Sequence, residues 1–241
     1  MTTFSIDLLD QSDRLPNIGL VVLQEDETLE SEMRRYFSPT VADLYVSRVP
    51  SGRKVTQDSL AEIAGGVKRA TTLFPHSIAF DAVGYCCTSG AAVTGVEKIG
   101  SLVRSGCFAT HVTEPLSALI HACRQSNVRR LAYLSPYIES VNEVLRATLF
   151  EAGIETPAFG SFDESEEAIV ARIDPDCTKM AAIELARSAD VDAVFLSCTN
   201  LKTFDILAEI SNATGLPTIS SNSALAQHLG TLAGVDLAAS K

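Results

Sequence analysis

The chain has 241 residues, of which 46% are hydrophobic and 20% are charged. This length and composition allow one large domain or two small lobes and exclude disorder for most of the chain. Its 30 acidic and 19 basic side chains give a formal net charge of -11, so we expect neither nucleic acid nor an anionic membrane as a partner. The sequence shows no basic leader and no apolar run of membrane-spanning length, which predicts a cytoplasmic protein that acts on a small molecule.

Short β-branched runs alternate with longer segments of helical period along the whole chain. This alternation predicts an α/β fold built from parallel sheets. The predicted strands cover residues 18–23, 44–49, 77–85, 110–112, 130–134, 158–161, 191–196 and 217–220. The predicted helices cover residues 28–37, 58–74, 91–105, 115–126, 138–152, 177–188, 201–212 and 223–233.

Two predicted strands end at a cysteine followed by small hydroxyl or amide residues. These cysteines, Cys87 and Cys198, are 111 residues apart, and the same offset relates Asp26 to Tyr137 in the loops after the first strand of each half. The shared offset predicts two pseudo-symmetric lobes, each a parallel sheet flanked by helices, with the site in the cleft between them. A single doubly wound sheet is the alternative. The predicted lobes comprise residues 1–112 with 220–241, and residues 113–219.

Cys87 and Cys198 are placed where ligands bind in open parallel sheets, at the carboxyl ends of the strands. A helix that starts just after each cysteine would lower the pKa of its thiol. Two thiols that approach one carbon from opposite sides suit one-base, one-acid chemistry. Ordinary buried packing is the alternative for both residues. We assign the other four cysteines to structure: Cys86, Cys107, Cys123 and Cys177.

The sequence offers no motif for a metal, a nucleotide or a hydrolytic triad. It lacks CxxC pairs and Cys/His clusters, and its four histidines are scattered. It also lacks GxxxxGK[ST], and no GxGxxG follows a strand. We therefore expect chemistry without a cofactor, although no motif excludes a pyridoxal lysine.

Several short motifs together resemble those of the aspartate/glutamate racemase superfamily. The resemblance lies in the branch of maleate cis-trans isomerase, arylmalonate decarboxylase and ectoine-utilisation protein A, and it covers nearly the whole chain. It implies two similar α/β lobes with the site between them. The motifs are Ile18-Gly19-Leu20-Val21-Val22-Leu23, Gly84-Tyr85-Cys86-Cys87-Thr88-Ser89, Ser135-Pro136-Tyr137-Ile138 with Val141-Asn142, Ala171-Arg172-Ile173-Asp174, and Leu196-Ser197-Cys198.

The resemblance also implies roles for particular residues. Cys87 looks like the nucleophile or base, Cys198 like the opposing acid, and Tyr137 like a contact to a substrate carboxylate. Both cysteines are present, whereas the decarboxylase branch keeps only the second, so the resemblance favours isomerase or racemase chemistry. Further carboxylate-binding donors are implied at Thr88, Ser89, Thr199 and Asn200.

The loop at residues 24–27 departs from the maleate isomerase pattern. In the maleate isomerases, a substrate-binding asparagine occupies the position of Asp26, so the aspartate argues against maleate as the substrate. An acidic loop at this position resembles that of the ectoine-utilisation group. An ammonium or amide group directed at Asp26 would suit a ligand such as an amino acid or an ectoine-derived diamino acid. Alternatively, Asp26 caps the next helix.

These observations predict a cofactor-independent isomerase or racemase that acts on a small carboxylic or amino acid. A decarboxylase is one alternative. Another is an accessory protein that binds a metabolite without turnover in a pathway of the ectoine-degradation type. A homo-oligomer is compatible with the sequence, which leaves the oligomeric state and the exact substrate open.

Overall fold

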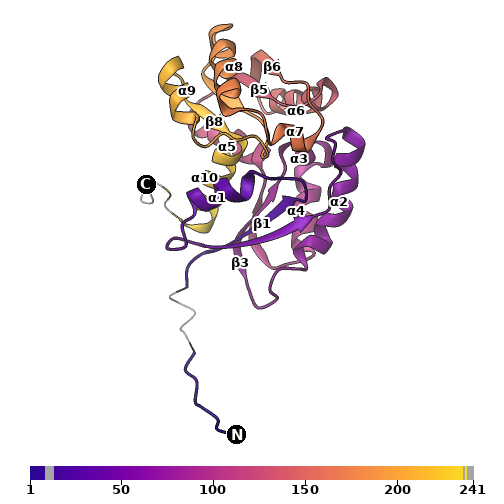
Figure 1. The fold of residues 1–241 in the computed structure, drawn as a ribbon, viewed down its shortest axis with the longest axis vertical. Helices are drawn as coiled ribbons and strands as arrows, with labels where there is room; N and C mark the ends of the chain where they lie inside the picture. The colour runs from indigo at the N-terminus through magenta and orange to yellow at the C-terminus, as the bar shows by residue number, and fades with distance from the viewer. Residues whose placement is uncertain (9–13, 236, 238–241) are drawn as a thin grey trace.

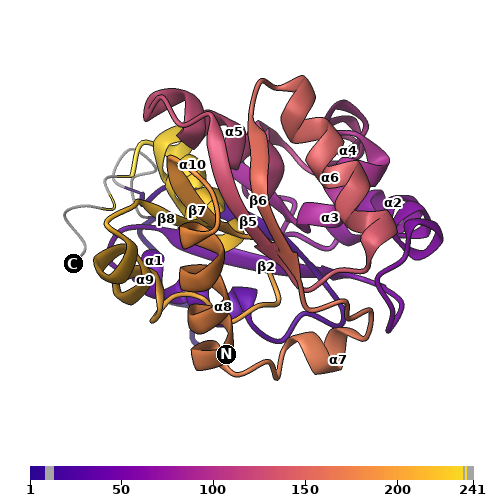
Figure 2. The ribbon, with the colours of Figure 1, turned by 90° about the horizontal axis from the view of Figure 1, so that it is seen from above.

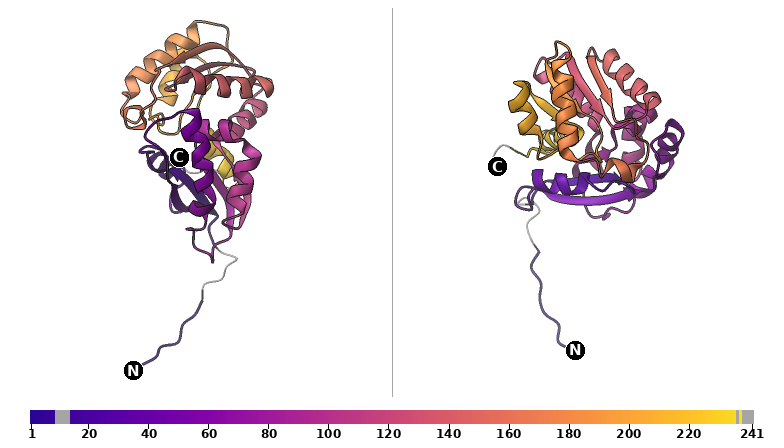
Figure 3. Two further views of the ribbon diagram at one scale, coloured as in Figure 1. Left: turned by 90° about the vertical axis from the view of Figure 1, so that its right-hand side faces the viewer. Right: turned by 45° about the horizontal axis from the view of Figure 1, so that its top comes forward.

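The computed structural model describes residues 1–8, 14–235 and 237, and these residues form two four-stranded sheets. The strand orders are β2-β1-β3-β4 and β6-β5-β7-β8, and every pairing is parallel. The two orders are identical when each strand of the second sheet is matched with the strand four places earlier in the chain. The predicted α/β fold with two pseudo-symmetric lobes is therefore confirmed (Figures 1 and 3).

The strands of the first lobe are β1 (Asn17–Leu23), β2 (Asp43–Val49), β3 (Phe80–Cys86) and β4 (Ala109–Thr113). Those of the second lobe are β5 (Arg130–Ser135), β6 (Glu155–Ser161), β7 (Ala193–Leu196) and β8 (Thr218–Ser220). The helices are α1 (Leu29–Tyr36), α2 (Gln57–Thr71), α3 (Thr88–Thr94), α4 (Val96–Arg104), α5 (Pro115–Gln125), α6 (Glu139–Glu151), α7 (Glu167–Val170), α8 (Pro175–Arg187), α9 (Leu207–Thr214) and α10 (Ser221–Ala233).

Helices cover both faces of each sheet, so the central strands are buried on both sides. All seven residues of β1 are buried, which explains its continuous apolar sequence. In the second lobe, α6 and α8 lie on opposite sides of the sheet (Figure 2). One buried cluster runs through both lobes and includes Cys87, Tyr137 and Cys198.

The last helix, α10, returns to the first lobe. Its Leu225 and Leu229 belong to the same buried cluster as Ile18 and Leu20 of β1. α10 also approaches β3 closely at Gly84, where an added Cβ would lie 3.2 Å from the Leu229 side chain. This packing places α10 against β1 and β3 of the first lobe, and the division into residues 1–112 with 220–241 and 113–219 stays a prediction.

The largest differences from the predicted helices are at three places, and the ends of the other helices lie within three residues of the predicted ones. The helix predicted over 91–105 is two helices, because Gly95 adopts a φ of 90° between α3 and α4. The helix predicted to begin at 201 begins at Leu207 instead. The short helix α7 was not predicted at all.

Candidate active site

Cys87 lies at the junction of β3 and α3 and caps the helix. Its Sγ accepts a hydrogen bond from Gly90 N at 3.2 Å, and Ser89 Oγ lies 3.6 Å from the same sulfur. The residue is only 4% exposed. Burial raises the pKa of the Cys87 thiol to about 12, although the two hydrogen bonds act in the opposite direction. The expected lowering of this pKa at a helix N-terminus is therefore wrong, because burial outweighs it.

Cys198 occupies the equivalent position after β7, with a different local geometry. Its φ of 126° lies in a region that residues with a Cβ rarely adopt. Ser221 Oγ accepts a hydrogen bond from Cys198 N at 3.0 Å, and Asn200 N donates to Cys198 Sγ at 3.4 Å. Since α9 begins only at Leu207, no helix starts directly behind this thiol, contrary to the sequence-based expectation. Burial raises the pKa of Cys198 well above its ordinary value.

Two buried tyrosines accompany the thiols. The Tyr137 hydroxyl interacts with the Cys198 thiol and also lies close enough to Cys87 for a charge there to raise the pKa of Tyr137. The Tyr85 hydroxyl and the Cys87 thiol both lie against Gly90. A Cβ added to this glycine would be 2.5 Å from Tyr85 Oη and 2.9 Å from Cys87 Sγ, so the two groups are neighbours. Sequence reasoning gave Tyr85 no role. Its position two residues before Cys87, on the same face of the strand, was the signal that could have found it.

Asp26 faces the site with one of its two carboxylate oxygens already used. Asp26 Oδ1 accepts hydrogen bonds from Thr28 N at 2.9 Å and from Leu29 N at 2.8 Å, which fixes the start of α1. Asp26 Oδ2 is buried and has no hydrogen-bond partner among the described residues. The capping alternative is thus present in the structure. Burial raises the pKa of the Asp26 carboxyl, and the neighbouring side chain of Thr199 and the charge of Arg48 act in the opposite direction.

Glu167 is a buried acid of the site that sequence reasoning missed. Its backbone is held by the first lobe, because Glu167 N donates to Arg53 O at 2.9 Å and Val55 N donates to Ser165 O at 2.8 Å. Burial raises the pKa of its carboxyl to about 7, and the negative charge of Asp26 acts in the same direction. Only the run Glu166-Glu167 just before the Ala171–Asp174 motif hinted at an acid here.

The polar residues expected to bind a carboxylate mostly bond to the protein itself. Asn200 Oδ1 accepts from Glu27 N at 2.8 Å, and Asn200 Nδ2 donates to Glu167 Oε2 at 2.8 Å. Thr88 Oγ1 donates to Ser221 Oγ at 2.8 Å. Thr199 Oγ1 donates to the backbone oxygen of Cys86 at 3.4 Å. Ser89 Oγ lies 3.6 Å from Cys87 Sγ.

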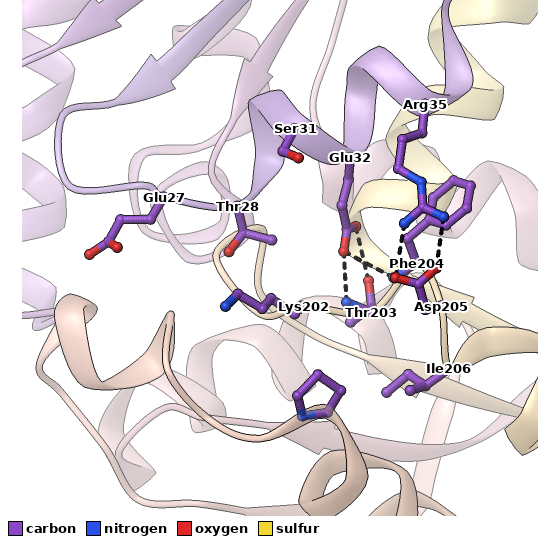
Figure 4. Close-up of a pocket in the computed structure, with 11 residues that line it drawn as sticks. Glu27, Thr28, Ser31, Glu32, Arg35, Lys202, Thr203, Phe204, Asp205 and Ile206 are labelled. Atoms are coloured by element: carbon purple, nitrogen blue, oxygen red, sulfur yellow. Dashed lines mark hydrogen bonds and ion pairs between the residues drawn. The ribbon is translucent and has the colours of Figure 1, made fainter.

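The two lobes are also joined beside the site. Glu32 of α1 accepts hydrogen bonds from Thr203 N at 2.7 Å and Phe204 N at 2.9 Å, and Arg35 forms an ion pair with Asp205 (Figure 4). A cavity of about 200 Å³ lies along this contact. These contacts position the loop after Cys198 against the loop that carries Asp26.

The other cysteines are placed as follows. Cys86 is fully buried in the cluster on the opposite face of β3 from Cys87, as the strand alternation predicted. Cys123 is buried, Cys107 is half-buried and Cys177 is exposed.

Within the described part of the chain, no group of three or more His, Cys, Asp or Glu side chains could hold a metal ion. No helix in that part is long and apolar enough to cross a bilayer.

The fold and the site define a two-lobed α/β protein with paired thiols at equivalent strand ends. The family model described as arylmalonate decarboxylase matches residues 103–241, and the chain belongs to that family. The arylmalonate decarboxylase of Bordetella bronchiseptica is 31% identical over 109 residues, an alignment that spans 45% of each chain. The maleate isomerase of Pseudomonas putida is 22% identical over 239 residues, which cover 93% of each chain.

Solved structures share this fold over almost the whole length. A Nocardia farcinica maleate cis-trans isomerase, a cysteine-to-serine mutant with a covalently bound succinylcysteine intermediate, matches with a TM-score of 0.79 and 20% identity, covering 93% of this chain and 96% of that chain. A maleate isomerase from Pseudomonas putida S16, solved with maleate, matches with a TM-score of 0.77 and 21% identity, covering 93% and 97% of the two chains. The predicted resemblance is confirmed by these matches.

Proposed function

We propose that this protein is a cofactor-independent isomerase or racemase of a small carboxylic or amino acid, with Cys87 as nucleophile or base and Cys198 as the opposing acid. One observation carries the proposal. The two thiols end equivalent strands of the two lobes and share one buried cluster with Tyr137, whose hydroxyl lies near both. Two proton-transfer groups related by a pseudo-two-fold axis suit chemistry at one carbon from opposite faces.

Either form of the reaction can be written with these residues alone. In racemisation, one sulfur as thiolate removes the α-proton and the opposite thiol delivers its proton to the other face of the carbon. In cis-trans isomerisation, the Cys87 sulfur as thiolate bonds to one alkene carbon while the Cys198 thiol gives its proton to the other carbon and becomes a thiolate. Rotation about the resulting single bond and the reverse steps then release the isomer and return the proton to Cys198.

The relatives support a covalent cysteine route. The Nocardia farcinica isomerase carries a succinylcysteine, which is the adduct that addition of a thiol to maleate would give. In the present chain, Tyr137 is the proposed contact to a substrate carboxylate, and Ser89, Thr88, Thr199 and Asn200 are proposed to shape the site around it. A small carboxylate or amino acid is the proposed partner, and cytoplasmic location and homo-oligomerisation stay predictions.

Decarboxylation is the second candidate, and the family assignment favours it. The matching family model is described as arylmalonate decarboxylase, and it covers the half of the chain that contains Cys198. Loss of CO2 from a malonate leaves a carbanion that a single thiol can protonate, so this reaction needs Cys198 alone. The accessory, metabolite-binding role in an ectoine-type pathway is the alternative if no turnover occurs.

One experiment separates these functions. Candidate amino acids, maleate and phenylmalonate are incubated with the protein in deuterated water and followed by NMR. Exchange of the α-proton or formation of fumarate supports isomerase chemistry, provided that both Cys87→Ala and Cys198→Ala abolish it. Phenylacetate formation that survives Cys87→Ala supports the decarboxylase, and the absence of all three reactions supports the accessory role.

A further inference from the structure

The Tyr85 hydroxyl is buried beside Cys87 and has no hydrogen-bond partner among the described residues. Tyr85 is fully buried and lies two residues before Cys87, so both side chains point to the same side of the sheet, where they share one buried cluster. Tyr85 Oη and Cys87 Sγ also face one point at Gly90, as the position of an added Cβ shows. A buried hydroxyl without a hydrogen bond destabilises the folded protein, so we expect this one to serve a purpose other than packing.

The surroundings of the Tyr85 hydroxyl keep its proton in place. Burial raises the pKa of Tyr85 well above its ordinary value, and negative charge at Cys87, Cys86 or Glu114 acts in the same direction. The Glu114 carboxylate is already committed to the start of α5, where its two oxygens accept hydrogen bonds from backbone N–H groups at 2.6 and 2.8 Å. Cys86 points to the opposite face of β3. The phenol is therefore a donor, and the Cys87 sulfur is the neighbouring group to which it can donate.

A thiolate at Cys87 needs hydrogen-bond donors, because its surroundings otherwise oppose a negative charge. Burial and the charges of Glu167 and Asp26 all raise the pKa of the Cys87 thiol. The hydrogen bonds from Gly90 N at 3.2 Å and from Ser89 Oγ at 3.6 Å act in the opposite direction. Hydrogen bonds to an ionised acceptor are stronger than those to a neutral one, so a third donor would act mainly on the thiolate and little on the thiol.

We propose that Tyr85 is a positioning residue for the reaction, whose hydroxyl donates a hydrogen bond to the Cys87 sulfur when that sulfur becomes a thiolate. This inference rests on the proposed function and deepens it by adding a residue that acts through Cys87. In the resting protein the neutral thiol leaves the hydroxyl without a partner, and the thiolate supplies one. The hydroxyl thereby stabilises the charged form of Cys87 relative to the neutral form. Tyr85 keeps its proton throughout, so the proton balance of the reaction is unchanged.

Tyr85→Phe tests this role, because it removes the hydroxyl and keeps the ring. Prolonged labelling of Cys87 with iodoacetamide at pH 8, followed by mass mapping, reports on the thiolate, which is the form that reacts. Hydrogen exchange of the backbone at residues 87–95 reports how often this segment opens, which labelling of a buried thiol also requires. We expect the ratio of the labelling rate to the exchange rate to fall at least about fivefold in Tyr85→Phe. This ratio is insensitive to a change in packing that only makes the segment open more or less often.

The matched control is Tyr45→Phe, which removes the hydroxyl of a half-buried tyrosine packed edge-to-face against Phe80 and should leave the ratio unchanged. Because the Tyr85 hydroxyl has no partner in the resting protein, the urea unfolding midpoint of Tyr85→Phe should equal or exceed that of the wild type. An unchanged or higher ratio, or a lower midpoint, would overturn the proposal. Labelling needs no substrate, so a lower ratio without turnover of any substrate would support the hydrogen bond and contradict the proposed function.

Discussion

Asn200 Nδ2 donates a 2.8 Å hydrogen bond to the carboxylate of Glu167, although the two residues are 33 positions apart in the chain. This bond ties the loop after Cys198 to α7, and the same asparagine binds the loop after β1 through Glu27 N. Asn200 thus holds together three segments that come from both lobes. The side chain that resemblance had marked as a substrate donor is engaged in positioning a buried acid.

The buried carboxyl of Glu167 should make the stability of the protein depend on pH. Its pKa is raised from 4.5 to about 7 in the folded protein, so between these values the folded chain holds a proton that the unfolded chain has lost. Its contribution to stability is therefore full below pH 4.5 and is lost as the pH rises to 7, by up to about 3 kcal/mol. Because Glu167→Gln cannot ionise, its unfolding free energy relative to the wild type should rise by about that amount between pH 5 and pH 8. Urea unfolding at the two pH values measures the change, and a constant difference would contradict it.

The paired thiols give the most direct prediction about activity. Because Cys87 and Cys198 are proposed to act from opposite faces, Cys87→Ala and Cys198→Ala should each lower isomerase turnover by about 10²–10⁴-fold. Cys107→Ala removes a half-buried thiol outside the site and should retain turnover. Initial rates from the NMR assay provide the measurement. Near wild-type activity in either of the first two variants would rule out the two-thiol mechanism.

The sequence predicts the architecture well because apolar patterning and strand length are local properties. The continuous apolar run of β1 and the offset between Cys87 and Cys198 were enough to predict two equivalent lobes. The acid at Glu167 could not be found in this way, since its place depends on pairing of residues 165–167 with residues 53–55 of the other lobe. The helix break at Gly95 was also missed, because the residues on both sides have helical periodicity.

Thiol burial reverses an expectation about cysteine labelling. A catalytic thiol at a helix N-terminus is expected to alkylate early and at low pH, but Cys87 is 4% exposed and burial raises its pKa to about 12. Cys177, at the exposed start of α8, should therefore react first with iodoacetamide in the folded protein. Mass mapping after brief treatment at pH 8 identifies the modified residue, and a sample unfolded in urea serves as the control in which all six cysteines react. Early modification of Cys87 would show that its thiol is more accessible than the structure indicates.

Gly90 should be intolerant of a side chain. A Cβ at this position would lie 2.5 Å from Tyr85 Oη and 2.9 Å from Cys87 Sγ, so Gly90→Ala must displace one of the two groups. We expect destabilisation by about 1–3 kcal/mol and a loss of turnover of at least about tenfold. Gly65→Ala is the matched control, because nothing lies within 4 Å of its added Cβ and alanine favours the interior of α2. Equal turnover in the two variants would show that the contact between Tyr85 and Cys87 can shift without consequence.

The backbone at Cys198 makes a prediction that separates strain from chemistry. The φ of 126° at Cys198 destabilises the folded protein by about 1–3 kcal/mol. The same strain arises for any residue with a Cβ, whereas glycine adopts this φ without it. Both Cys198→Ala and Cys198→Gly remove the thiol and should be inactive, but the glycine variant should be more stable than the alanine variant by about 1 kcal/mol. The same pair of substitutions at Cys123, within α5, should show the opposite order, because glycine weakens a helix relative to alanine by about 1 kcal/mol. Urea unfolding midpoints of the four variants test both signs, and the same order at the two positions would mean that the backbone at Cys198 is not strained.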